Sequence, residues 1–233
     1  MSNFQIINLF PLSLYKSKIE LSPKYKNELQ DLIVKMKSES QNLDYKSENK
    51  SWTGDTQGFE NLHLNKKFEI LYSKISSEIK KYIDVLNIDN DQIDLFYQRS
   101  WATISDKIEN ISPHIHAQSH ISFAYYLKKD SNDSNIVFFD QNRNNEIIPG
   151  LFNSKSINLK KVLKKRNDFN TSVVKIDVQE NDIIIFPSKT LHATEQKNSN
   201  DSRISISADI SIISKDAANL EHLTPSINNW KKF

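Results

Sequence analysis

Hydrophobic and polar positions along the chain follow a helical period before Ile93. Apolar residues recur three and four positions apart in two stretches, residues 22–37 and 66–86. The first stretch begins with Ser22, which suits an N-cap, and with Pro23, which suits the first helical position. Because each stretch is apolar on one side only, each predicts an amphipathic helix that packs against a core.

From Ile93 onward the pattern predicts strands. Runs rich in aromatic and β-branched residues occur at residues 93–104, 121–127, 135–140, 172–178 and 182–186. Pro187 ends the last of these runs, and the alternating residues 203–207 follow. We expect this final strand to fade after Asp209. Residues 4–15 alternate irregularly and predict one or two short strands.

The spacing of these elements indicates one domain over residues 1–233. We expect helical support over about residues 1–90, a β core over about residues 91–213, and a partly ordered tail over residues 214–233. No internal repeat or clear linker divides the chain. The size is sufficient for a substantial hydrophobic core.

Composition excludes several classes of function. The net charge is +2, so nothing indicates a nucleic-acid partner or an anionic membrane. The chain has no cysteine, which excludes disulfides, iron–sulfur clusters and thiol catalysis. No apolar run approaches the roughly 18 residues of a membrane helix, and no signal peptide is evident. We therefore expect a cytoplasmic protein without membrane attachment.

Two close histidines form the first candidate site. Pro113 favours extended backbone at Ser112, and His114 and His116 follow it. In an extended segment, residues two apart point to one face and lie about 6–7 Å apart along the chain. Both imidazoles could therefore reach one metal ion.

A third histidine and an arginine form the second candidate site. His192 follows the apolar strand that Pro187 ends, and Arg203 begins the alternating segment in which Arg203 and Ser205 share a face. Imidazole suits ferrous iron in sites that leave positions open for O₂ and an organic acid. Arginine can hold a carboxylate through two parallel hydrogen bonds. The pattern indicates non-haem iron with a carboxylate co-substrate.

Four segments together resemble a known family. They are His114-Ile115-His116, the strand Ser-Phe-Ala-Tyr-Tyr-Leu at residues 122–127, residues 181–192 ending in Phe-Pro-Ser-Lys-Thr-Leu-His, and Arg203-Ile204-Ser205. They resemble the small bacterial and phage 2-oxoglutarate-Fe(II) oxygenases, which are similar to prolyl hydroxylases. The resemblance covers about residues 93–213 and implies an α+β fold. It implies a double-stranded β-helix core, of jelly-roll or cupin-like type, with N-terminal supporting helices.

The resemblance also implies an activity and a set of site residues. The expected protein is a 2-oxoglutarate- and Fe(II)-dependent dioxygenase that uses O₂, hydroxylates an unidentified substrate and releases succinate and CO₂. His114, His116 and His192 would bind the metal. Arg203 and Ser205 would hold the distal carboxylate of 2-oxoglutarate, and Tyr126 would present its hydroxyl to the same co-substrate.

Two positions depart from the family pattern. Asn181 stands where glycine is usual, a mild change because asparagine tolerates a left-handed turn. His116 stands where most of the superfamily has Asp or Glu. His116 is either a third neutral ligand or points away, which leaves two histidines completed by water or by Asp140. Three imidazoles with Fe²⁺ and dianionic 2-oxoglutarate sum to zero charge, and we favour this arrangement.

Other interpretations stay open. A cupin-like histidine metalloenzyme without 2-oxoglutarate and a catalytically degenerate β-helix that serves as a binding module are the alternatives. His120 is interpreted as a residue that supports the site, or as a surface histidine. The basic residues 155–166 are interpreted as a loop or lid rather than a nucleic-acid site, because interleaved aromatics are missing. The expected partner is a small molecule or a peptide side chain, and a homodimer is allowed.

Overall fold

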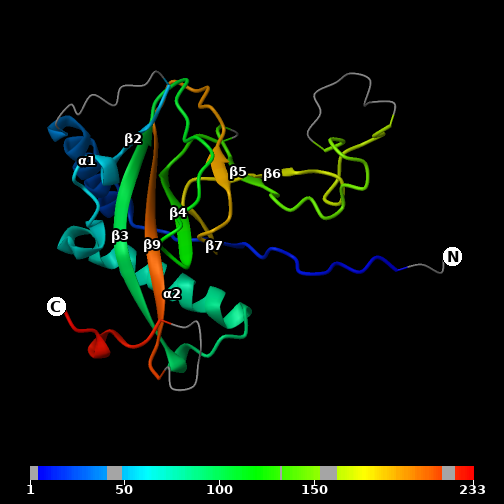
Figure 1. Cartoon of the computed structure of the whole chain (residues 1–233). Coiled ribbons are helices and arrows are strands. Elements are labelled where there is room, and N and C mark those ends of the chain that lie inside the picture. Colours follow the sequence, from blue (N-terminus) through cyan, green and yellow to red (C-terminus); the bar gives the residue numbers. More distant parts are fainter. Residues whose placement is uncertain (1–4, 41–48, 132, 153–161, 217–223) are drawn as a thin grey trace.

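Two antiparallel sheets form the framework of the protein. The computed structural model describes residues 5–40, 49–131, 133–152, 162–216 and 224–233 (Figure 1). The six-stranded sheet has the order β1-β7-β4-β9-β3-β2, and the three-stranded sheet has the order β6-β5-β8. The strands are β1 (Tyr15–Lys18), β2 (Trp52–Thr53), β3 (Ile93–Ser105), β4 (Ile121–Lys128), β5 (Ile136–Phe139), β6 (Val173–Ile176), β7 (Asp182–Pro187), β8 (His192–Thr194) and β9 (Arg203–Ser214). This mixture of antiparallel strands and few helices confirms the α+β prediction.

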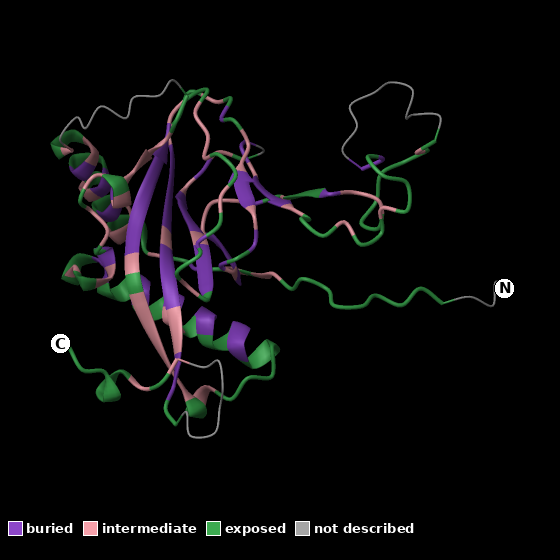
Figure 2. Cartoon of the chain, viewed as in Figure 1, coloured by how far each residue is buried: buried purple, intermediate pink, exposed green. Residues whose placement is uncertain are grey.

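Two helices cover one face of the larger sheet. They are α1 (Pro23–Glu39) and α2 (Glu69–Val85), and the 3₁₀ turn Lys66–Phe68 leads into α2. The backbone N–H of Tyr25 donates to the Ser22 hydroxyl at 3.4 Å, and Pro23 begins α1, as expected. The helices bury their apolar faces in one cluster with the sheet. Figure 2 colours the buried residues of these helices and strands purple. Among the described residues, neither helix is long and apolar enough to span a membrane.

Strand β9 divides its side chains between two environments. Ile204, Ile206 and Ala208 belong to the cluster beneath the helices. The alternate residues face the space between the two sheets, because successive side chains of a strand point to opposite faces. Thr103 on β3 and Tyr126 on β4 both pair with Ser205 of β9, so the three central strands face this space together. The framework therefore places polar side chains in the interior between the sheets.

Two predictions about strand boundaries were wrong. Strand β9 does not fade after Asp209 but continues to Ser214, because β3 pairs with it as far as Ile93. Residues 5–14 form no strand, and β1 instead begins at Tyr15, where it pairs with Ile185 of β7. In both places a strand that is distant in sequence decides the boundary, and the local alternation of residues does not.

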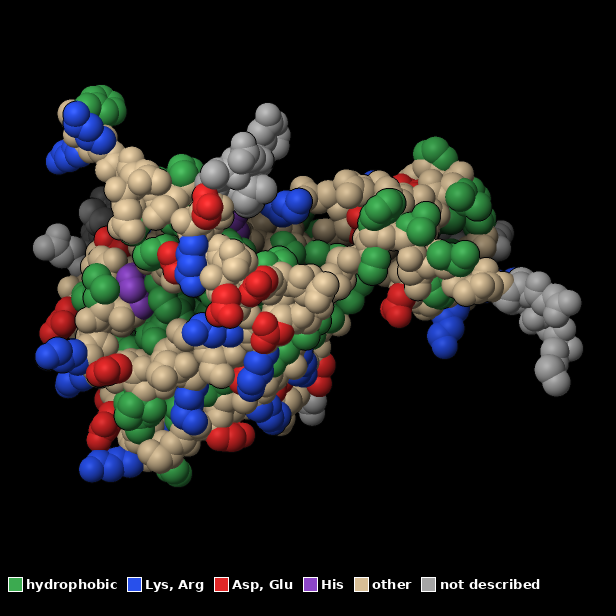
Figure 3. Space-filling model, turned by 90° about the horizontal axis from the view of Figure 1, so that it is seen from below, with side chains coloured by type: hydrophobic (Ala, Val, Ile, Leu, Met, Phe, Trp, Pro, Cys, Tyr) green, Lys and Arg blue, Asp and Glu red, His purple; other side chains and the backbone are tan. Residues whose placement is uncertain are grey.

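Hydrophobic side chains are also found on the part of the molecule that projects beyond the sheets. The extended N-terminal residues 5–14 and the described residues 141–152 and 162–172 project there (Figures 1 and 3). Phe10 is 94% exposed and Ile147 is 89% exposed. The described residues between 141 and 170 contain neither helix nor strand.

Candidate functional site

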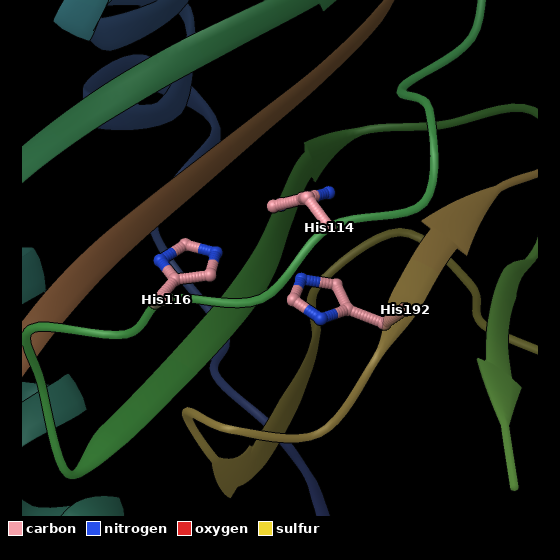
Figure 4. A group of neighbouring side chains, drawn as sticks. All are labelled: His114, His116 and His192. Atoms are coloured by element: carbon pink, nitrogen blue, oxygen red, sulfur yellow. The ribbon is translucent and has the colours of Figure 1, made fainter. Parts of the chain in front are cut away.

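Three histidines converge between the sheets. His114 and His116 lie on the connection from β3 to β4, and His192 begins β8 (Figure 4). His114 and His192 bond each other through the backbone, with N···O distances of 2.9 and 3.1 Å. One ring nitrogen from each histidine lies within 4.8 Å of the others. His114 and His116 lie together because they are two residues apart in the sequence. The backbone pairing of His114 with His192 brings the third histidine to them.

The hydrogen bonds of the three rings fix the position of their protons. Nδ1 of His114 lies 2.8 Å from the carbonyl oxygen of Ser112, and Nδ1 of His192 lies 2.8 Å from that of Thr190. Nδ1 of His116 contacts the carboxylate of Asp209. Because a carbonyl or a carboxylate can only accept, each Nδ1 carries the proton, and each Nε2 keeps a lone pair. This is the tautomer that a metal ligand requires, so the three residues fit a divalent metal.

Burial keeps two of these imidazoles neutral. Burial, together with the neighbouring His114, lowers the pKa of His192 to about 3. Burial also lowers the pKa of His114 from its ordinary value. The lone pairs of both rings are therefore available at neutral pH.

The lowered pKa predicts how pH affects the metal-free protein. An unfolded histidine titrates near 6.5, so between about pH 6.5 and 3 the unfolded chain binds more protons at this position. The contribution of His192 to the free energy of unfolding is therefore fully present above about pH 6.5, and it is lost as the pH falls toward 3. His192→Asn should reduce this loss, which urea midpoints at about pH 4.5 and about pH 7.5 would measure for both proteins. An equal loss in both proteins would contradict the expectation.

Asp140 does not join the histidines. Its side chain is exposed, and Oδ1 accepts a hydrogen bond from the backbone N–H of Asn142 at 2.9 Å. Within the described ranges, the group of potential metal ligands consists of His114, His116 and His192. The structure therefore groups His116, and not Asp140, with His114 and His192.

A pocket of about 230 Å³ opens beside the three rings. Arg203, Ser205 and Tyr126 line it together with the histidines. The Arg203 side chain is 2% exposed, yet no carboxylate among the described residues forms an ion pair with it. Its Nη2 donates to Ser105 Oγ at 2.7 Å, its Nη1 donates to Ser134, and its Nε is buried without a partner.

The surroundings of Arg203 favour an anion in this pocket. A buried cation without a counter-charge is costly, and a carboxylate is its natural partner. Burial raises the pKa of Tyr126 to about 12, so its hydroxyl stays protonated and can donate. Ser205 lies opposite Tyr126 in the strand register and is 8% exposed. The structure therefore brings all six candidate residues to one pocket.

Asp209 is a site residue that the sequence reasoning missed. It lies on β9 in the alternation of Arg203, Ser205 and Ser207, and its side chain is fully buried. Burial raises the pKa of this carboxyl, but the His116 hydrogen bond and the charge of Arg99 lower it below the ordinary value. The signal was present in the sequence, because the face shared by these residues continues through Asp209.

Two other candidates lie outside this site. Nδ1 of His120 accepts a hydrogen bond from the backbone N–H of Ile212 at 2.9 Å, so this exposed histidine supports β9. In the basic stretch, residues 155–161 lie outside the described part of the chain. Arg166, at the end of the stretch, donates to the carbonyl oxygen of Phe152 at 3.0 Å.

The fold and the site together define the jelly-roll class of 2-oxoglutarate-Fe(II) oxygenases. Residues 99–209, slightly less than half of the chain, match the model of the family described as "Putative 2OG-Fe(II) oxygenase". The matched segment extends from Arg99 to Asp209 and contains the three histidines and Arg203. The resemblance predicted from the sequence is confirmed.

Solved structures agree on the fold. The non-heme alpha-ketoglutarate-dependent carbocyclase SnoK from nogalamycin biosynthesis is 10% identical over 92% of this chain and 87% of its own, with a TM-score of 0.56. The viral collagen prolyl hydroxylase of Paramecium Bursaria Chlorella virus-1, solved with 2-oxoglutarate, is 14% identical over 84% of this chain and 94% of its own, with a TM-score of 0.50. HygX of Streptomyces hygroscopicus, with nickel and 2-oxoglutarate bound, is 8% identical over 86% of this chain and 82% of its own, with a TM-score of 0.51. No curated protein matched the sequence. At these identities the structures establish the jelly-roll fold alone.

Proposed function

We propose that the protein is a 2-oxoglutarate- and Fe(II)-dependent dioxygenase that hydroxylates a small molecule or a peptide side chain. The observation that carries this proposal is one pocket that contains both three metal-ready histidines and a buried arginine without a counter-ion. The family supports the oxidoreductase class. Hydroxylation, O₂ as oxidant, and succinate and CO₂ as products are the finer part of the proposal.

His114, His116 and His192 would hold the iron. Ferrous iron would supply the chemistry that couples decarboxylation of 2-oxoglutarate to oxidation of a substrate C–H bond. The chain contributes three imidazole nitrogen donors whose rings are already held by hydrogen bonds at Nδ1. The nickel and 2-oxoglutarate in HygX support a divalent metal with this co-substrate.

Arg203 would hold the distal carboxylate of 2-oxoglutarate. Its position at the start of β9 puts a cation in the same pocket as the histidines, and Ser205 and Tyr126 add hydroxyl groups to this pocket. The two charges of 2-oxoglutarate would balance the two charges of Fe²⁺. Because Arg203 is buried, its contact with a carboxylate would be stronger than at an exposed site.

An anaerobic titration tests the proposal. Adding Fe(II) and then 2-oxoglutarate to the purified protein should produce the metal-to-ligand charge-transfer absorption of the chelate. Oxygen should then produce succinate, and a panel of amino acids, peptides and small metabolites should raise its rate for the true substrate. Metal binding without the absorption band would favour the cupin-like alternative. Absence of metal binding would favour a degenerate binding module.

The role of His116 has its own prediction. His116→Ala should weaken Fe(II) binding about as much as His114→Ala, by about 10–100-fold or more. His116→Asp should retain iron, because it restores the carboxylate common in the superfamily. Isothermal titration under nitrogen would measure both affinities. Normal iron binding by His116→Ala would show that two histidines suffice.

The remaining expectations stay predictions. They are the cytoplasmic location, the single domain over residues 1–233 and a homodimer.

A further inference from the structure

A buried carboxylate lies directly behind one of the three histidines. Asp209 is 0% exposed, and its Oδ1 contacts Nδ1 of His116. Gln118 Nε2 donates to Oδ2 at 2.8 Å, and Ser119 Oγ donates to Oδ1 at 3.3 Å. Nε of Arg99 also donates to Oδ2. Both oxygens of this carboxylate are therefore bonded, and one of the bonds leads to the metal site.

The strand register fixes the position of the carboxylate. Arg99 on β3 lies opposite Asp209 on β9, next to the irregularity between Tyr97 and Arg99. On the other side, Ser122 of β4 pairs with Asp209. Since β9 is a central strand paired on both sides, the backbone of Asp209 is fixed, and the hydrogen bonds to its two oxygens hold the carboxylate.

The ring of His116 is held at two points. Trp101 stacks on it with ring centroids 5.7 Å apart and an interplanar angle of 19°. The guanidinium carbon of Arg99 lies 4.9 Å from the centroid of the Trp101 ring, so the same arginine contacts both Asp209 and Trp101. Stacking fixes the plane of the imidazole, and the hydrogen bond at Nδ1 fixes its rotation within that plane.

The partner of His116 differs in charge from the partners of the other two rings. Nδ1 of His114 and Nδ1 of His192 each donate to a neutral backbone carbonyl two residues earlier, that of Ser112 or Thr190. Only His116 of the three donates to a carboxylate. A carboxylate partner makes an imidazole a stronger donor to a metal than a neutral carbonyl does.

We propose that Asp209 is the positioning residue of the metal centre. Its carboxylate binds Nδ1–H of His116 and directs Nε2 toward the other two histidines. This places a negative charge behind the imidazole ring of His116, on the side away from the other two histidines. The inference rests on the proposed metal site.

The first test compares metal affinities of variants. Asp209→Asn keeps the shape of the side chain and removes its charge, and it should weaken Fe(II) binding by about 10–100-fold. Glu78→Gln is the matched control, because Glu78 is a 7% exposed carboxylate on α2, beneath the other face of the sheet. This control should bind Fe(II) like the wild type.

A double variant separates positioning from general destabilisation. If Asp209 acts through His116, then Asp209→Asn should cause no further loss of Fe(II) affinity in a His116→Ala background. An equal loss in both backgrounds would overturn the proposal, because Asp209 would then act through the fold. Wild-type affinity in the single variant would also overturn it.

The second test needs no variant and no iron. In ¹⁵N-labelled wild-type protein, NMR should show that His116 carries its proton on Nδ1. That proton should resonate further downfield than those of His114 and His192, whose acceptors are neutral. A proton on Nε2 of His116 would refute the inference even if Asp209→Asn fails to fold. If the wild type binds no metal but shows this signal, the proposed function fails and the Asp209 contact stands.

Discussion

Arg203→Ala should lose 2-oxoglutarate binding and keep its iron. Removing one partner of a buried charge pair costs roughly 2–5 kcal/mol, because the other charge is left unmatched. At about 1.4 kcal/mol per tenfold change, this corresponds to about 30-fold to several-thousand-fold weaker binding. The measurement is the charge-transfer absorption as 2-oxoglutarate is added to the Fe(II) protein without oxygen.

Arg203→Lys gives the conservative control. Lysine keeps the positive charge but lacks the planar fork that matches a carboxylate, so it should recover part of the affinity. Retained iron binding in Arg203→Ala shows that the variant is folded. If Arg203→Ala binds 2-oxoglutarate with wild-type affinity, the co-substrate assignment is wrong and the cupin-like alternative is favoured.

His114→Ala and His192→Ala should each weaken Fe(II) binding by at least about 10–100-fold. Each change removes one of three nitrogen donors, and the backbone bonds between the two residues remain because they involve no side-chain atoms. Anaerobic titration with an iron chelator as competitor measures the affinities.

The matched control for these variants is His120→Ala. His120 lies four positions from His116, but its ring bonds the backbone of Ile212 outside the group of three. Its Fe(II) affinity should equal that of the wild type. Unchanged stoichiometry and affinity in both ligand variants would exclude a metal site at these histidines.

The parts of the site that depend on local spacing could be predicted from the sequence. The separation of His114 from His116 placed them together, and the alternation that begins at Arg203 placed Ser205 beside it. Those relations hold within a few residues, where backbone geometry alone decides which side chains share a face.

The parts that depend on distant pairing could not be predicted. The length of β9 is set by β3 and β4, so the sequence reasoning ended the strand too early. Asp209 lay within the predicted strand, but its contact with His116 joins two segments that are distant in sequence. The choice between His116 and Asp140 depends on side-chain direction, which the hydrogen bonds to Asp209 and Asn142 decide. The histidine pattern was therefore visible in the sequence, and its supporting hydrogen bonds were not.

The backbone pairing of His114 with His192 has a consequence for metal selectivity. Because two reciprocal hydrogen bonds join these residues, their spacing is set by the main chain before any ion binds. Imidazole nitrogen suits several divalent ions of the first transition row, so this donor set alone does not select iron. Copper and nickel bind nitrogen sites more tightly than ferrous iron does. Iron occupancy would then depend on which metal the cell makes available as the chain folds, and protein purified on nickel resin should carry nickel.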